Sequence, residues 1–213
     1  VFDESGQNRT HTFEHVRQQS DKVTGKQNLS LADYIKPSEQ PEDYLGGFTV
    51  SIFGAEELAN EYKAKGDDYS AILIQSLADR FAEAFAEHLH ERIRKEFWGY
   101  KADETLSNEE LIKEKYVGIR PAPGYPACPE HSEKAVLFDW LGSEAKIGTK
   151  LTEHFAMMPP SSVSGFYYSH PQSEYFNVGK ISQDQLEDYA KRKGWTLDEA
   201  KRWLAPNLDD SIG

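Results

Sequence analysis

The sequence of 213 residues lacks several features that would place it in a familiar class of protein. It has one cysteine, Cys128, which excludes an intrachain disulfide framework. It has no apolar run long enough to cross a bilayer and no secretory-signal pattern. Its 24 Lys and Arg against 36 Asp and Glu give a formal net charge of -12, which argues against nonspecific binding to nucleic acid or anionic membranes. We expect a cytoplasmic protein.

Nucleotide-binding and metal-binding motifs are also missing. No G-x-G-x-x-G follows a predicted strand and no Walker-type loop is present, which disfavours a Rossmann methyltransferase and a phosphate site. Cys128 lies between Ala127 and Pro129 without a paired base, so we expect an inert thiol. His88 and His90 point to different faces of a helix, and His11 and His15 are better spaced but lie in a weakly structured segment. Cys128 and His131 form a pair of possible ligands without further partners, so we expect no structural metal.

The N-terminal third of the chain predicts a polar segment followed by a strand and a helix. A chain of this length can bury one core, and we expect a single domain over residues 1–213. Residues 1–26 are polar and predict a surface segment, and residues 30–33 offer a cap for a short turn. Alternating apolar residues predict a half-buried strand over residues 46–54, and a helix is expected over residues 55–64.

The longest predicted helix begins at Asp67 or Asp68 and runs to about residue 97. It carries large apolar residues at steps of three and four, which predict a buried stripe: Ile74, Leu77, Phe81, Phe85, Leu89, Ile93 and Phe97. It also carries an acidic ridge of Asp79, Glu83, Glu87 and Glu91. We interpret the ridge as a solvated face. The alternative is that Glu83 or Asp79 faces a ligand or a neighbouring domain.

The C-terminal half predicts further helices and a small sheet. Ser107 and Glu110 form a capping-box pattern for a helix that ends near Tyr116. A helix is expected over residues 132–145. Aromatic-rich segments separated by prolines then predict an antiparallel meander of strands at residues 151–157, 163–168 and 175–179, followed by helices at residues 182–193 and 197–204.

The segment GIRPAPGYPACPEH, residues 118–131, is the most distinctive part of the chain. Its four prolines fix their own φ angles and push the preceding residues toward extended geometry, so the segment cannot be a helix and holds one shape. Gly124 is the position where another molecule can approach the main chain closely. Arg120 is the one arginine of the segment.

This segment resembles the Arg-x-x-x-Gly-Tyr run, here Arg120 to Tyr125, of the activation domain of cobalamin-dependent methionine synthase. In that family the run binds S-adenosylmethionine. The resemblance extends over nearly the whole chain from about Thr10, and other segments carry it: LADRFAEAFAEHLHERIRKEFWGY at 77–100, LSNEELIKEKY at 106–116, LTEHFAMMPPSSVSGFYYSHPQSEYF at 151–176, DQLEDYAKRKG at 184–194 and RWLAPNL at 202–208.

The resemblance implies an α/β (α+β) fold in which helices surround a bent antiparallel sheet. It implies a reactivation module of a methyltransferase, which binds S-adenosylmethionine and presents its methyl group to cobalamin on a neighbouring domain during methionine biosynthesis. A flavodoxin-like reductase is the implied electron donor for reductive remethylation. The isolated chain is not expected to be catalytically competent, and no catalytic residue and no metal ligand are assigned to it.

The resemblance also implies the residues of the ligand site. Arg120 is suited to bind the methionyl carboxylate through a bidentate, charge-assisted hydrogen bond. Main-chain groups of the proline-rich segment are suited to the adenine or the amino group, and aromatic faces to the adenosine or the sulfonium cation. The implied cofactor-binding residues are Arg120, Ala122, Gly124, Tyr125, Tyr175 and Phe176.

Two expectations concern affinity and partners. The family's domain begins with further residues that include an aspartate of the ligand site, and no matching segment precedes Val1. We therefore expect a truncated piece of the domain with weakened binding of S-adenosylmethionine. Glu83 is the first candidate to replace the missing carboxylate. The rival hypothesis is an interaction domain that docks a cobalamin domain or a reductase without binding S-adenosylmethionine.

A basic cluster is expected either to steer an acidic partner or to form a solvated helix face: Lys191, Arg192, Lys193, Lys201 and Arg202.

Overall fold

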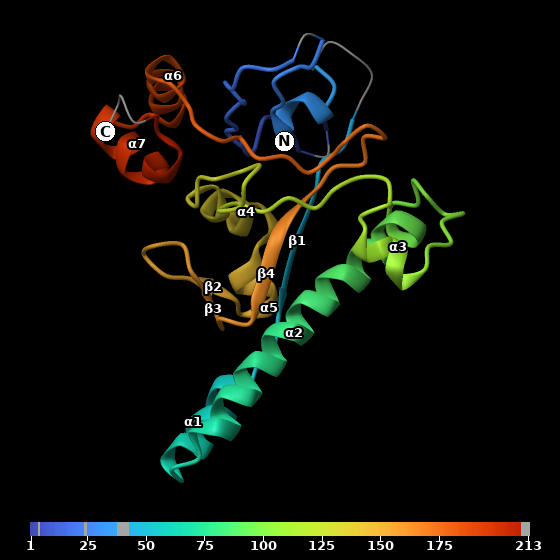
Figure 1. The fold of residues 1–213 in the computed structure, drawn as a ribbon, viewed down its shortest axis with the longest axis vertical. Helices are drawn as coiled ribbons and strands as arrows, with labels where there is room; N and C mark the ends of the chain where they lie inside the picture. Colours follow the sequence, from blue (N-terminus) through green and yellow to red (C-terminus); the bar gives the residue numbers. More distant parts are fainter. Residues whose placement is uncertain (4, 24, 38–42, 210–213) are drawn as a thin grey trace. The chain divides into compact units, whose positions relative to one another are not determined.

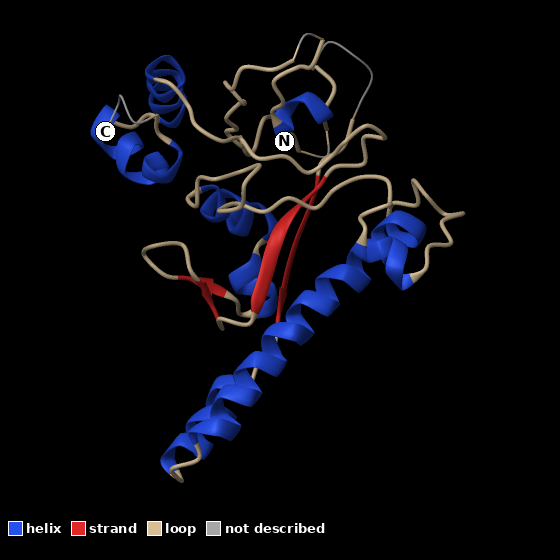
Figure 2. Cartoon of the chain, in the orientation of Figure 1, coloured by secondary structure: helices blue, strands red, loops and turns tan. Residues whose placement is uncertain are grey.

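The structure is a computed structural model that describes residues 1–3, 5–23, 25–37 and 43–209. The chain divides into two compact units, and each is described by itself. Unit 1 consists of Val1–Gly46, Val117–Val136 and Phe166–Gly213, and unit 2 of Gly47–Tyr116 and Leu137–Gly165. The expectation of a single domain stays a prediction. The elements combine helices with small sheets, which confirms the α+β class (Figures 1 and 2).

Unit 2 contains the longest helix of the chain. Helix α1, Ala55–Ala64, has the predicted bounds, and it lies alongside α2, Asp68–Arg92 (Figure 1). Asp67 caps α2, which agrees with the predicted start: its carboxylate accepts a hydrogen bond from the Ser70 N–H. A π-helical turn, η2 at Ile93–Phe97, continues it, so the helical run reaches the predicted end.

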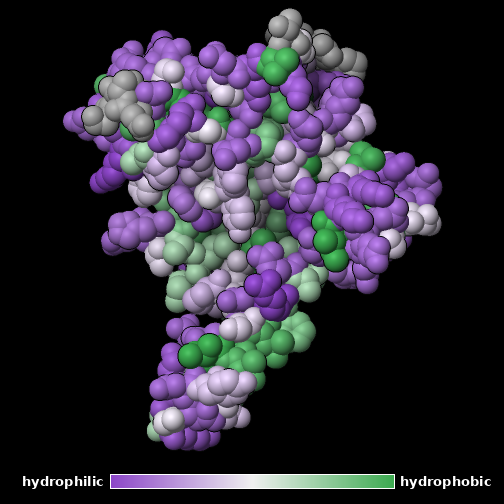
Figure 3. Space-filling model, in the orientation of Figure 1, coloured by the Kyte–Doolittle hydropathy of each residue, from purple (hydrophilic) through white to green (hydrophobic). Residues whose placement is uncertain are grey.

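The predicted buried stripe of α2 is wrong over most of its length. Several of the large side chains are exposed, as Leu77 at 52%, Phe81 at 56% and Phe85 at 47% illustrate, and Figure 3 shows a green hydrophobic patch where α1 and α2 lie. Small residues form the buried face instead, because they let the backbone of α2 pack closely on its neighbours: Ala71, Ala78, Ala82 and Ala86. Periodicity identified the helix but not the face that packs.

The acidic ridge of α2 lies largely in solvent, as we interpreted it. Glu83 is exposed, and the Asp79 carboxylate accepts a hydrogen bond of 2.7 Å from the buried Ser161 hydroxyl. Asp79 therefore ties the helix to the segment before β4, which runs from Ser162 to Tyr167.

The remaining strands and helices around unit 2 are short. Strand β1, Gly46–Ser51, pairs with β4, and β2, Lys150–Leu151, pairs antiparallel with β3, Met157–Met158. The predicted capping box of Ser107 and Glu110 is present, but α3 runs only over Asn108–Ile112. The expected helix at 132–145 is two helices, α4 at Glu133–Leu141 and α5 at Ser143–Ile147, because Gly142 adopts φ 66° between them.

The predicted antiparallel meander is wrong in two of its three strands. Residues 152–156 form a tight turn, in which Phe155 N–H donates to the Thr152 carbonyl and Phe155 has φ 59°. Residues 175–179 form no strand. They run beside the proline-rich segment, whose prolines have no N–H to donate to a ladder.

Unit 1 contains η1, Leu31–Tyr34, and the two predicted C-terminal helices, α6 at Gln183–Lys193 and α7 at Leu197–Leu204, followed by η3 at Ala205–Asn207. Its core is a cluster of Val16, Val178, Ile181, Leu186, Tyr189, Ala190, Ala200, Leu204 and Leu208. The N-terminal segment is therefore not wholly a surface segment, since Val16 belongs to this core. Across the described ranges, no helix has the length and apolar character that crossing a membrane requires.

Candidate functional site

Backbone hydrogen bonds hold the proline-rich segment against residues 166–178 of unit 1. Ile119 and Tyr168 exchange two hydrogen bonds of 3.0 Å. The Pro121 carbonyl accepts a hydrogen bond of 2.9 Å from the Phe166 N–H. The Pro126 carbonyl accepts another, also of 2.9 Å, from the Val178 N–H. Prolines keep their carbonyl oxygens, so the segment is fastened through acceptors although it lacks donors.

Two turns fold the middle of the segment onto itself. The Tyr125 N–H donates to the Ala122 carbonyl at 3.1 Å, and the Gly124 N–H donates to the Cys128 carbonyl at 2.7 Å. The Cys128 N–H donates back to the Tyr125 carbonyl at 2.9 Å. The N–H groups of Gly124 and Tyr125 are therefore used within the loop. Main-chain contacts from these two residues to a ligand would have to come from carbonyl oxygens, which have two lone pairs each.

Gly124 is required by its conformation and by its neighbour. Its φ is +92°, and a Cβ at this position would lie 2.3 Å from Cε1 of the His131 ring. The His131 Nδ1 lies 3.2 Å from the Lys134 ammonium. Partial desolvation, together with the charge of Lys134, lowers the pKa of His131, which favours a neutral imidazole against the glycine.

The structure brings two predicted site residues together. The Arg120 N–H donates a hydrogen bond of 3.1 Å to the Tyr175 hydroxyl, although the two residues are 55 positions apart. Tyr175 is 36% exposed and Tyr125 58% exposed, so part of each side chain is accessible to solvent. Phe176 instead packs against the core of unit 1, with its ring centroid 6.5 Å from that of Tyr34. Its role in covering a ligand stays a prediction.

Sequence reasoning missed the polar and aromatic groups that support this loop. The Tyr34 ring lies 6.2 Å from the Tyr168 ring and 5.8 Å from His170. His15 lies between two groups of the site, with Nε2 3.1 Å from the Tyr168 hydroxyl and Nδ1 4.0 Å from the Cys128 sulfur. The consecutive aromatic residues at 166–168 indicate part of this cluster in the sequence. The polar stretch around His15 gives no indication that this residue lies beside the loop.

His15 makes the stability of unit 1 depend on pH. Burial, with a smaller contribution from the Arg192 charge, lowers the pKa of His15 to about 4 from 6.5. Between pH 6.5 and pH 4 the unfolded chain binds a proton at His15 that the folded chain does not. The contribution of His15 to the free energy of unfolding is therefore complete above pH 6.5 and is lost as the pH falls toward 4. We expect this residue to remove about 2 kcal/mol from the free energy of unfolding between pH 7 and pH 5.

Urea denaturation of the wild type and of His15→Gln at both pH values measures this contribution. The variant should be less stable at pH 7 and should lose about 2 kcal/mol less than the wild type on acidification. Equal losses in the two proteins would show that His15 titrates normally in the folded state.

A buried ionic cluster anchors the end of the segment to α6. The Lys193 ammonium lies 2.6 Å from the Glu133 carboxylate and 3.6 Å from Glu130. The Ser132 N–H donates to Glu130 at 2.6 Å, and the Tyr189 hydroxyl donates to the same carboxylate at 3.3 Å. Desolvation raises the pKa of Glu133 despite the nearby ammonium. The cluster is internally paired, which fits a role in holding the loop.

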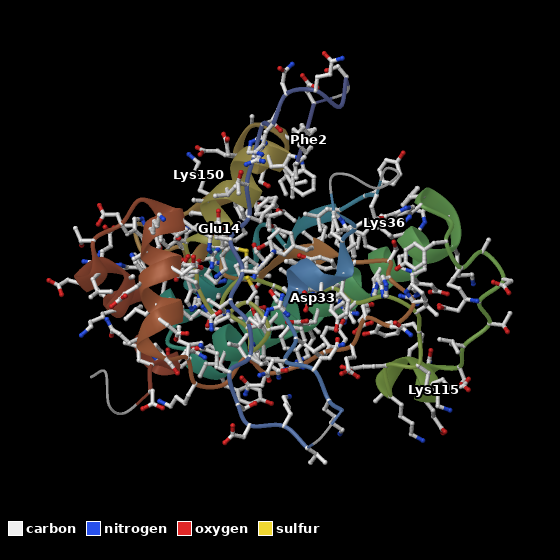
Figure 4. The ribbon with its side chains drawn as sticks, turned by 90° about the horizontal axis from the view of Figure 1, so that it is seen from above. Phe2, Glu14, Asp33, Lys36, Lys115 and Lys150 are labelled. Atoms are coloured by element: carbon white, nitrogen blue, oxygen red, sulfur yellow. The ribbon has the colours of Figure 1, made fainter. Side chains whose placement is uncertain are left out.

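This cluster changes the interpretation of the basic residues. Lys193 is half-buried and lies against the two carboxylates. Arg192 bonds to Asp188 at 2.8 Å and also to Glu14, which is labelled in Figure 4. Two of the five basic residues of the proposed patch, Arg192 and Lys193, are therefore paired with carboxylates of unit 1. An electrostatic steering effect would be correspondingly smaller.

Metal binding finds no support in the described part of the chain, where no group of three or more His, Cys, Asp or Glu side chains could hold an ion. Burial and the nearby Glu133 and Glu130 raise the pKa of the Cys128 thiol well above its usual value. This raised pKa favours the neutral thiol, and its low reactivity stays a prediction, since the His15 Nδ1 lies 4.0 Å from the sulfur.

Two comparisons bear on this site. The family model described as vitamin B12 dependent methionine synthase, activation domain, matches residues 1–194. Among solved structures, the crystal structure of the MetH reactivation domain bound to AdoHcy is 53% identical in sequence with a TM-score of 0.91. The match covers 98% of this chain and 65% of that chain, so this chain spans 65% of the length of that relative.

Proposed function

Because the chain belongs to the family of the activation domain of vitamin B12 dependent methionine synthase, we propose that unit 1 binds S-adenosylmethionine at the proline-rich segment. The observation that carries the proposal is the hydrogen bond between the Arg120 N–H and the Tyr175 hydroxyl, which joins the two implied halves of the site. The similarity to a domain bound to AdoHcy, the demethylated form of S-adenosylmethionine, supports it.

The groups present fit the parts of this ligand. The Arg120 guanidinium matches a carboxylate in charge and geometry. The exposed faces of Tyr125 and Tyr175 suit an adenine ring or a sulfonium cation. Carbonyl oxygens of the folded loop suit the ligand's amino groups, since Gly124 and Tyr125 spend their N–H groups within the loop. Ala122 and Phe176 complete the proposed site.

The role of the chain in the reaction is to bind and orient. When bound, S-adenosylmethionine supplies an electrophilic methyl group for the remethylation of reduced cobalamin, which a neighbouring domain would hold. No proton is removed from the ligand in this transfer, so the residues of this chain need no general base. We further propose that a flavodoxin-like reductase is the electron donor, that the module serves methionine biosynthesis as part of a methyltransferase, and that it works in the cytoplasm.

Replacing Arg120 with alanine tests the proposal. We expect the affinity for S-adenosylmethionine and AdoHcy to fall by about 1.5–3 kcal/mol, which is roughly tenfold to 150-fold, because a charge-assisted hydrogen bond to the carboxylate is lost. Isothermal titration calorimetry gives the two dissociation constants. Thermal unfolding of the variant should change little.

Arg17→Ala is the matched control, because Arg17 also lies in unit 1 but pairs with Asp33 at the surface. This control should bind both ligands like the wild type. Equal affinity for wild type and Arg120→Ala would remove the proposed carboxylate contact. A complete absence of binding by the wild type, with docking to a cobalamin domain intact, would favour the rival hypothesis of a pure interaction domain.

A further inference from the structure

Residues 13–16 pack against two aromatic residues that lie beside the proposed ligand site. The ring centroids of Phe13 and His15 lie 4.8 Å and 6.0 Å from that of Phe166, both edge to face. The His15 Nε2 atom lies 3.1 Å from the hydroxyl of Tyr168, which is buried. We define residues 13–16 as the N-terminal strap.

The two aromatic partners of the strap also hold the proline-rich segment in place. The Phe166 N–H donates to the Pro121 carbonyl, and Tyr168 exchanges two backbone hydrogen bonds with Ile119. Both aromatic residues therefore bind the proline-rich segment through their backbone and the strap through their side chains. Arg120 lies between the two anchored positions, so these contacts flank the arginine that is proposed to bind the ligand carboxylate.

His15 also reaches the turn that contains Gly124. Its Nδ1 atom lies 4.0 Å from the Cys128 sulfur, and the Cys128 carbonyl accepts the hydrogen bond of 2.7 Å from the Gly124 N–H. The two nitrogens of one imidazole thus contact a residue that anchors the Arg120 end of the loop and a residue that closes its Gly124 turn.

The backbone of the strap is fixed on both sides of His15. Val16 is 2% exposed and belongs to the core of unit 1. The Glu14 N–H donates a hydrogen bond of 3.0 Å to the Glu133 carboxylate of α4, and the Arg192 guanidinium of α6 donates to the His15 carbonyl at 3.2 Å. The imidazole is therefore presented to the loop from a backbone that is held by the core and by two helices.

The hydrogen bond between His15 and Tyr168 connects this fixed backbone to the site. The Tyr168 residue is 1% exposed, and a buried hydroxyl that loses its partner is costly, so the Tyr168 ring stays where the imidazole lies. We propose that His15 is a positioning residue, which sets the conformation of the proline-rich segment through Tyr168 and thereby the affinity for S-adenosylmethionine. The effect on affinity rests on the proposed function, whereas the effect on the segment requires no ligand.

Amide hydrogen exchange of the unliganded chain measures the effect on the segment. His15→Leu removes the hydrogen bond at a similar side-chain size, and His154→Leu, at an exposed histidine of unit 2, is the matched control. The protection of the Gly124 amide relative to that of the Leu186 amide, in the core of unit 1, should fall about tenfold in His15→Leu. A loss of global stability alone does not lower this ratio. The control should leave it unchanged.

Two further variants show whether the hydrogen bond is the cause. His15→Gln places an amide group where Nε2 lies and should keep most of the wild-type ratio. Tyr168→Phe removes only the hydroxyl oxygen and should lower the ratio as His15→Leu does, so it decides the question even where His15→Leu fails to fold. An unchanged ratio in Tyr168→Phe, or equal falls in His15→Gln and His15→Leu, would overturn the proposal.

Calorimetric titration with AdoHcy at neutral pH measures the effect on affinity. Tyr168→Phe and His15→Leu should bind about tenfold more weakly than the wild type, while His15→Gln and His154→Leu should bind within about twofold of it. A lowered exchange ratio with unchanged affinity would overturn the link between His15 and the ligand site. Absence of binding by the wild type would contradict the proposed function and the effect on affinity, and the exchange ratio would still decide whether His15 positions the segment.

Discussion

Replacing Glu104 with glutamine is expected to lower the free energy of unfolding by about 3–5 kcal/mol, because the change leaves a buried guanidinium without its counter-charge. The side chains of Arg94 and Glu104 are 1% and 6% exposed, and the Arg94 Nη2 lies 2.6 Å from the Glu104 carboxylate. The Arg94 Nε donates to both carboxylate oxygens at 2.9 Å and 3.0 Å. The guanidinium also lies 4.6 Å above the Tyr116 ring, so it holds two separate parts of unit 2 against the π-helical turn.

A neighbouring ion pair provides the control. Lys101 and Asp103 lie 3.5 Å apart, but the Asp103 side chain is 84% exposed, so Asp103→Asn should change stability by less than about 0.5 kcal/mol. Urea denaturation at neutral pH compares the variants with the wild type. A loss below 1 kcal/mol for Glu104→Gln would contradict the view that this pair is desolvated in the folded protein.

Replacing Gly124 with alanine is expected to weaken the binding of S-adenosylmethionine at least tenfold and to lower the free energy of unfolding by about 1–3 kcal/mol. Two causes act together. The φ of +92° is unfavourable for any residue with a Cβ, and the new methyl group would meet the His131 ring. The ring would have to move, and the loop that carries Arg120 and Tyr125 would shift with it.

Two further variants separate these causes. Gly25 has φ +91° with no atom within 4 Å of an added Cβ, so Gly25→Ala measures the backbone strain alone. It should destabilise the protein by about 1 kcal/mol and leave ligand affinity unchanged. Adding His131→Ala to Gly124→Ala should restore part of the lost affinity. Equal effects of Gly124→Ala and Gly25→Ala on binding would show that the contact with His131 does not shape the site.

Local signals predicted the helices well, and tertiary packing explains where prediction failed. Gly54 and Gly66 border α1, and Thr196 caps α7 by accepting a hydrogen bond from the Glu199 N–H, so these helices have the predicted bounds. The apolar stripe of α2 was assigned to the core because periodicity reports amphipathicity and not which face has a partner. The strand expected at 175–179 failed because its neighbour in space is a proline-rich segment, which the sequence order does not reveal.

The candidate site was predictable only in part. The family resemblance led to Arg120 and Tyr175, which the structure brings within hydrogen-bond distance. The internal use of the Gly124 N–H depends on two consecutive turns, and prolines alone do not specify which turns form. His15 contacts Tyr168 and Cys128, which lie more than a hundred positions further along the chain. A single sequence gives no sign of contacts between residues so far apart.

The most direct test of ligand binding by unit 1 is a crystal structure of this chain soaked with AdoHcy. We expect the ligand carboxylate to lie within hydrogen-bond distance of the Arg120 guanidinium, and the ring of Tyr175 or Tyr125 to contact the adenosine. Ligand bound away from the proline-rich segment at saturating concentration, or no ligand in unit 1 at all, would contradict it.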